Sequence, residues 1–106
     1  MSMTTPEPLT PGSLVGWHPE QVTAAVDGEV IVMGLIRGQY VGLDDIGSVL
    51  WTLLEQPRTV RQLCDDLGRR YQGDPATMSA DVVAFLEDLR ALDLIEVLDA
   101  APLSDP

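Results

Sequence analysis

Three short runs of strand-forming residues occupy the first half of the chain, separated by tight-turn dipeptides. Residues 22–26 read as a strand that ends at Asp27-Gly28, a pair favoured in two-residue hairpins because both positions tolerate positive φ. Residues 30–36 are apolar at nearly every position, as expected of a strand that is covered on both faces or lies centrally in a sheet. After Arg37-Gly38, residues 39–43 read as a third strand. The pattern predicts an antiparallel meander in which this third strand keeps an open edge.

Asp44 is expected to stop the third strand and to begin a helix with almost no loop. Its carboxylate can accept hydrogen bonds from the free N–H groups of the first helical turn, and Asp45 adds negative charge at the positive end of the helix dipole. Pro57 prevents extension of the helix much beyond residues 54–56. Trp51 lies off the apolar stripe, so we expect it to be buried against another element. The residues that recur on one face of this helix are Ile46, Val49, Leu50 and Leu53.

Two more helices are predicted after Pro57. Thr59 and Gln62 form a capping-box pair that opens the second helix, and Gly73 closes it. Asp74-Pro75 is the cap and first-turn signal of the third helix, and residues 95–98 add a short extended tail. The apolar stripe of the third helix consists of Met78, Val82, Phe85, Leu86, Leu89 and Leu92, with Asp81, Ala84 and Asp88 along one flank.

The two ends of the chain lack such patterns. Residues 1–19 hold four prolines and no sustained periodicity, so we expect a flexible or loosely docked lead-in. Trp17 is the exception, because a lone Trp at the end of such a segment more often covers the core than binds a ligand. Residues 99–106 are expected to be disordered. The predicted folded domain therefore spans residues 20–98.

Composition narrows the class of partner. The 106 residues fit one domain, and 6 Arg and Lys against 17 Asp and Glu give a net charge of −11. Such a charge argues against nucleic acid or an anionic membrane as the principal partner, although it is also explained by solubility alone. The single cysteine allows no internal disulfide, and the chain shows neither a secretion signal nor an apolar run of membrane-spanning length. We therefore expect a cytoplasmic protein.

No catalytic constellation is visible in the sequence. One histidine, His18, and one cysteine, Cys64, cannot supply a tetrahedral thiolate–imidazole metal site, and Cys64 sits on an apolar stripe as a small core residue. His18 has no pattern around it that would hold it in a catalytic arrangement. Asp44 and Asp45 are explained better by helix capping than by acid–base chemistry. We expect no enzymatic activity, no catalytic residue, no metal and no cofactor.

Several short motifs, taken together, resemble a known family. They are Tyr40 with Leu43, Gly47 with Trp51, the Pro-Arg-Thr-Val turn of residues 57–60, and Asp81-Val82 followed by Phe85-Leu86 and Leu89. In order and spacing, over residues 22–97, they resemble the PqqD-like proteins. These RiPP recognition elements, which include the lasso-peptide and PQQ-pathway types, hold the leader of a ribosomal precursor peptide for its modifying enzymes. Asp44 stands where many relatives have Asn, and the long Pro-rich N-terminus is unusual for the family.

The resemblance implies an α+β, winged-helix-like fold in which a three-stranded meander precedes three helices. It implies that a precursor leader peptide pairs as a fourth strand on the third strand and lies against the third helix, which agrees with the open edge predicted from the residues. Its further partner would be a modifying enzyme such as a protease, a cyclase or a radical maturase. The implied peptide-binding residues are Gln39, Tyr40, Val41, Gly42, Leu43, Asp81, Ala84, Phe85 and Asp88, of which Phe85 could equally be a core residue.

Two other functions stay open on sequence grounds. A winged-helix transcription regulator would use the second and third helices as a helix-turn-helix, yet the candidate recognition helix, residues 75–92, carries one Arg against several acidic residues. A small enzyme subunit with no activity of its own is the other alternative.

Overall fold

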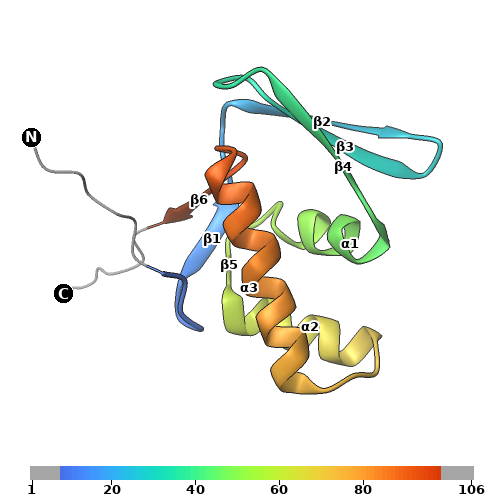
Figure 1. Cartoon of the computed structure of the whole chain (residues 1–106), viewed down its shortest axis with the longest axis vertical. Helices are drawn as coiled ribbons and strands as arrows, with labels where there is room; N and C mark the ends of the chain where they lie inside the picture. Colours follow the sequence, from blue (N-terminus) through green and yellow to red (C-terminus); the bar gives the residue numbers. More distant parts are fainter. Residues whose placement is uncertain (1–7, 99–106) are drawn as a thin grey trace, which may run out of the picture.

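The computed structural model describes residues 8–98, which form two antiparallel sheets and three helices (Figure 1). The meander sheet has the order β2 (Gln21–Val26), β3 (Glu29–Gly34) and β4 (Gln39–Leu43). The helices that follow are α1 (Asp45–Leu53), α2 (Val60–Arg70) and α3 (Pro75–Ala91). The predicted α+β class and the meander followed by three helices are confirmed.

Positive backbone angles shape both turns of the meander sheet. Asp27 and Gly28 have φ of 53° and 82°, which is the conformation that a two-residue hairpin needs, as predicted. Gly38, with φ of 68°, donates its N–H to the carbonyl of Gly34 at 2.9 Å and so closes the second turn. This turn begins at Leu35, and β3 therefore ends two residues before the predicted strand of residues 30–36 does. Because Leu35 and Ile36 are also apolar, the hydrophobic pattern could not locate the end of the strand at Gly34.

The two faces of the meander sheet differ. Val32 and Leu43 point into the core, where Val32 is fully buried and Val41 packs beside them. On the opposite side, which we call the outer face, cross-strand neighbours Val22, Met33 and Tyr40 are exposed. Two explanations were predicted for the apolar run of β3. The central position in the sheet is confirmed, whereas the strand is not covered on both faces.

A second, terminal sheet was missed by the sequence analysis. It has the order β5 (Arg58–Thr59), β1 (Leu14–Trp17) and β6 (Ile95–Leu98), with β1 antiparallel to both neighbours. The expectation of a flexible or loosely docked lead-in is therefore wrong for β1, in which Val15 is fully buried. The predicted extended tail of residues 95–98 is confirmed as β6. Residues 1–7 and 99–106, for which flexibility and disorder were predicted, lie outside the described residues.

The two tryptophans join the sheets to α1. Trp51 is buried, as predicted, and its ring stacks on that of Trp17 with centroids 5.1 Å apart and an interplanar angle of 18°. The indole N–H of Trp17 donates to the Trp51 carbonyl at 2.9 Å, and the indole N–H of Trp51 donates to the Thr23 hydroxyl at 3.0 Å. Trp17 packs against the core, as predicted. One buried ring therefore contacts β1 of the terminal sheet and β2 of the meander sheet.

The predicted caps are present at all three helices. Asp44 accepts from Gly47 N at 2.7 Å, Thr59 and Gln62 form the full capping box, and Asp74 accepts from Thr77 N at 3.0 Å. Cys64 packs at the edge of the core as a partly buried apolar residue, also as predicted.

The buried face of α1 lies to one side of the predicted stripe. Its buried residues are Gly47, Leu50 and Trp51, whereas Ile46 is 45% exposed. Because α1 has only nine residues between two sheets, the large Trp51 ring decides which side faces the core. Ile46 is thereby turned toward the space between α1 and α3.

Candidate functional site: an open strand edge and an acidic groove

The strand β4 has a neighbour on one side only among the described residues, because β3 is its sole partner in the meander sheet. The predicted open edge is therefore confirmed for the described part of the chain. An unpaired edge of this kind presents a row of free N–H and C=O groups that can bind an added strand.

The register of β3 decides which backbone groups of β4 are free. Leu35 N donates to Glu20 O at 2.9 Å, just beyond the paired ends of β2 and β3, so odd-numbered residues of this segment bond to β2. The two-residue turn at Asp27-Gly28 requires the same parity, since the pair that closes such a hairpin is hydrogen-bonded. Even-numbered residues of β3 therefore bond to β4, as Val32 does opposite Val41.

The free groups on β4 belong to Tyr40 and Gly42. Because successive residues of a strand point their N–H and C=O groups to opposite sides, these two residues face away from β3 while Val41 faces toward it. Tyr40 is 71% exposed, and a Cβ added to Gly42 would meet no atom within 4 Å. Gln39 is also exposed, and Leu43 is buried. The edge is thus sterically open at both outward positions.

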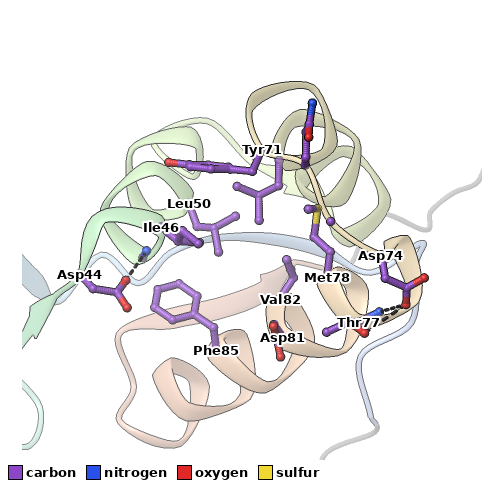
Figure 2. Close-up of a pocket in the computed structure, with 14 residues that line it drawn as sticks. Asp44, Ile46, Leu50, Tyr71, Asp74, Thr77, Met78, Asp81, Val82 and Phe85 are labelled. Atoms are coloured by element: carbon purple, nitrogen blue, oxygen red, sulfur yellow. Dashed lines mark hydrogen bonds between the residues drawn. The ribbon is translucent and has the colours of Figure 1, made fainter.

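A groove of about 490 Å³ begins where β4 ends (Figure 2). Asp44 and the first turn of α1 form one end and part of a wall, α3 forms the facing wall, and the segment after α2 closes the other end. Its apolar lining includes Ile46, Leu50, Met78, Val82 and Phe85. A peptide that followed the β4 edge toward α1 would reach this groove.

Of the residues predicted on α3, the structure places two in the groove and two outside its lining. Phe85 is partly buried, packs against the core and lies across from Ile46, so it is both a core residue and a groove residue (Figure 2). Asp81 is exposed on the same wall. Ala84 and Asp88 are exposed but do not line the groove. The residues of β4 do not line it either and form the separate edge that leads to it.

Several groove residues were not predicted as site residues. Ile46 and Met78 belonged to predicted apolar stripes, Asp74 was explained by the cap of α3, and Thr77 was not singled out. Tyr71, at the C-terminal end of α2, lies on the wall opposite α3 (Figure 2). Stripe positions at the end of a helix are the signal that could have found them, because such residues reach past the core.

The electrostatic character of the groove is uniform. Asp44, Asp74 and Asp81 line it, and no Arg, Lys or His does. The ion pairs of the described residues join Arg37 to Asp93, Arg58 and Arg69 to Asp66, and Arg90 to Glu87, and none of these residues lines the groove. An apolar floor with carboxylates around it suits a ligand that is apolar in part and positively charged in part.

Within residues 8–98, no group of three or more His, Cys, Asp or Glu side chains is placed to hold a metal ion. In the same part of the chain, no helix combines the length and the apolar character that a bilayer span requires. The features that stand out are those of a binding surface, an open strand edge that leads into a groove.

Solved peptide-recognition domains share this fold. The structure described as "TbiB1 in Complex with the TbiA(beta) Leader Peptide" matches with a TM-score of 0.71 and 31% identity, over 85% of this chain and 99% of that one. A lasso peptide synthetase B1 complexed with its leader peptide has a TM-score of 0.69 at 17% identity, over 77% and 96% of the two chains. The PqqD truncation of Methylobacterium extorquens PqqCD, a stand-alone RiPP recognition element, has a TM-score of 0.69 at 20% identity, over 83% and 94%.

The fold is therefore that of the RiPP recognition elements. Residues 29–95 match the family model described as coenzyme PQQ synthesis protein D, and the chain belongs to the PqqD family. The predicted family is confirmed. A search of curated proteins finds no match.

Proposed function

We propose that this chain binds the leader region of a ribosomally synthesised precursor peptide and presents it to a separate modifying enzyme. The observation that carries the proposal is the free edge of β4, whose outward backbone groups at Tyr40 and Gly42 lead directly into the groove between α1 and α3. Membership of the PqqD family supports it, as does the TbiB1 complex with its leader peptide.

In this function the leader adds an antiparallel fourth strand to the meander sheet. Backbone hydrogen bonds to Tyr40 and Gly42 supply affinity that is independent of the peptide sequence, and side-chain contacts in the groove supply specificity. The backbone groups of Gln39, Val41 and Leu43 point toward β3, so leader contacts at these three predicted residues would have to be made by their side chains. Those at Asp81 and Phe85 fall in the groove, whereas contacts at Ala84 and Asp88 require the peptide to continue along the exposed flank of α3.

The chain itself is not an enzyme in this proposal and acts in the cytoplasm. It brings the peptide to a protease, a cyclase or a radical maturase that carries the chemistry. The peptide-binding unit begins before residue 20, because β1 is part of the fold.

The competing function is DNA binding through α2 and α3. In the recognition helix α3, the single Arg90 is accompanied by Asp81, Glu87 and Asp88, and the chain carries a net charge of −11. Phosphates would be repelled by such a surface. The observations therefore favour the peptide-binding function.

Titration calorimetry with two ligands tests the proposal. One is a synthetic leader peptide of a candidate precursor chosen from the neighbouring genes, and the other is a DNA duplex of mixed sequence. We expect the leader to bind at micromolar affinity or better and the duplex not to bind at moderate salt. Tight, salt-dependent binding of the duplex without binding of the leader would overturn the proposal.

A further inference from the structure

We propose that the groove between α1 and α3 selects peptides that carry an apolar anchor side chain flanked by Arg or Lys. This inference rests on the proposed function and names the class of peptide that the site prefers. The apolar part of the groove, which includes Leu50, Val82 and Phe85, takes the anchor, and three aspartates take the basic flanks.

The positions of the aspartates give the preference a geometry. Asp44 stands at one end of the groove, Asp74 at the other, and Asp81 between them on the wall formed by α3 (Figure 2). Met78 and Phe85 line the space in between, opposite Tyr71. A peptide segment that lies along the groove would therefore place its anchor among apolar side chains and its neighbouring residues next to carboxylates.

The three aspartates Asp44, Asp74 and Asp81 form an acidic rim around the groove, and helix capping explains only part of it. Asp44 uses Oδ1 to accept from Gly47 N, and Asp74 uses Oδ2 to accept from the N–H and hydroxyl of Thr77. One oxygen of each carboxylate thus stays available to a ligand. Asp81 caps nothing, because it lies inside α3, where Asp is an unfavourable residue.

No basic side chain of the described residues neutralises the rim. Asp81 has neither an ion pair nor a hydrogen bond within residues 8–98, whereas Asp66 and Asp93, outside the groove, are each paired with Arg. The six basic residues of the chain are all Arg, and none of them lines the groove. Charge complementarity therefore favours a basic segment over an acidic or neutral one.

Selection from a library of random peptides tests the inference without knowledge of the natural precursor. The full chain is immobilised, binding peptides are enriched by mRNA display, and the recovered peptides are synthesised. We expect them to share an aromatic or Leu-sized residue with Arg or Lys within a few positions on at least one side. Replacing those basic residues by Gln should weaken binding, and rising salt should weaken the parent peptide more than its Gln variant.

Variants of the chain provide the second arm. Asp44→Asn and Asp74→Asn keep their caps, because Asn caps helices as well as Asp does, and Asp81→Asn keeps the size of the side chain. We expect each to lower the affinity of a selected basic peptide by about two- to fivefold, as a solvent-exposed ion pair does, and the triple variant to lower it by about tenfold or more. Glu55→Gln removes the same charge from an exposed site outside the groove and should change the affinity less than any of them.

The outcomes separate this inference from the proposed function. Enriched peptides without basic residues, or equal affinities for the triple variant and Glu55→Gln, would overturn the charge preference while leaving peptide binding intact. A selection from which no peptide emerges above background would contradict peptide binding itself. Thermal melts of every variant accompany the titrations, so that a loss of affinity is counted only for a folded chain.

Discussion

The ring of Trp17 stacks on the ring of Trp51 and donates its indole N–H to the Trp51 backbone carbonyl. Trp51 in turn donates to Thr23 and is only 1% exposed. The pair therefore holds β1, β2 and α1 in one arrangement. Loosening it should affect both sheets, although neither ring lines the groove.

Trp51→Ala should lower the free energy of unfolding by about 3–5 kcal/mol, because it removes a fully buried aromatic ring and leaves a cavity. Chemical denaturation followed by circular dichroism measures the loss. Trp17→Phe is the matched variant, since it keeps a ring for stacking but loses the N–H, and it should cost about 1 kcal/mol. An unchanged melting temperature for Trp51→Ala, together with lost peptide affinity, would assign Trp51 to ligand binding instead.

Proline substitution distinguishes the two sides of β4. Gly42→Pro removes an N–H that faces the open edge, so the chain should stay folded while leader affinity falls by at least about 1 kcal/mol, the order of one net hydrogen bond. Val41→Pro removes an N–H that bonds to β3 and should disrupt the sheet. Titration calorimetry and circular dichroism report the two effects.

Two side-chain variants control for the proline experiment. Gly42→Ala adds a methyl group that meets no atom within 4 Å, and Val41→Thr keeps the backbone donor, so both should bind the leader nearly as the parent chain does. If folded Gly42→Pro kept the parent affinity, strand addition at this edge would be wrong and the peptide would have to bind through the groove alone.

Two glycines should respond to alanine in opposite ways. A Cβ at Gly34 would lie 2.7 Å from Cδ2 of the buried Leu94, and we expect Gly34→Ala to cost about 1–3 kcal/mol through overpacking. Gly68 lies inside α2 with nothing within 4 Å of its Cβ position, and Gly68→Ala should stabilise the chain by about 0.5–1 kcal/mol. Denaturant midpoints check both signs, and a stabilised Gly34→Ala would show that Leu94 has room to move.

The outer face of the meander sheet should limit solubility when the net charge is lost. Val22 and Met33 are exposed cross-strand neighbours, and the charge of −11 disappears as the pH approaches the pI of about 4.1. Replacing both residues by Thr, which also favours strands, should lower the pH at which light scattering rises. An unchanged onset would mean that another surface drives self-association.

The sequence specified the elements that rest on local chemistry. Three such elements are the turn at Asp27-Gly28, the capping box of Thr59 with Gln62, and the cap at Asp74. Each involves residues within a few positions of one another, so it can be recognised from the sequence without knowledge of the fold. The open edge of β4 followed from strand order alone. Family membership followed from motifs in the same region.

Non-local pairing explains what the sequence did not reveal. The four residues of β1 pair with β6, some eighty positions later, and with the two-residue β5. The pattern of residues within Leu14–Trp17 does not predict which distant strands it pairs with. The groove was hidden for a related reason. Met78 and Ile46 read as core residues, and only the tertiary arrangement of α1 and α3 turns them toward solvent-accessible space.

The pairing of Leu14 with Leu98 places the first and last strands of the described domain side by side. A second domain fused at either end would therefore emerge from the terminal sheet, whereas the open edge belongs to the meander sheet (Figure 1). A maturation enzyme tethered at either end through a short flexible linker would meet the bound leader at millimolar effective concentration, even if its own affinity for the peptide were weak. The topology thus suits the chain to covalent fusion at either end.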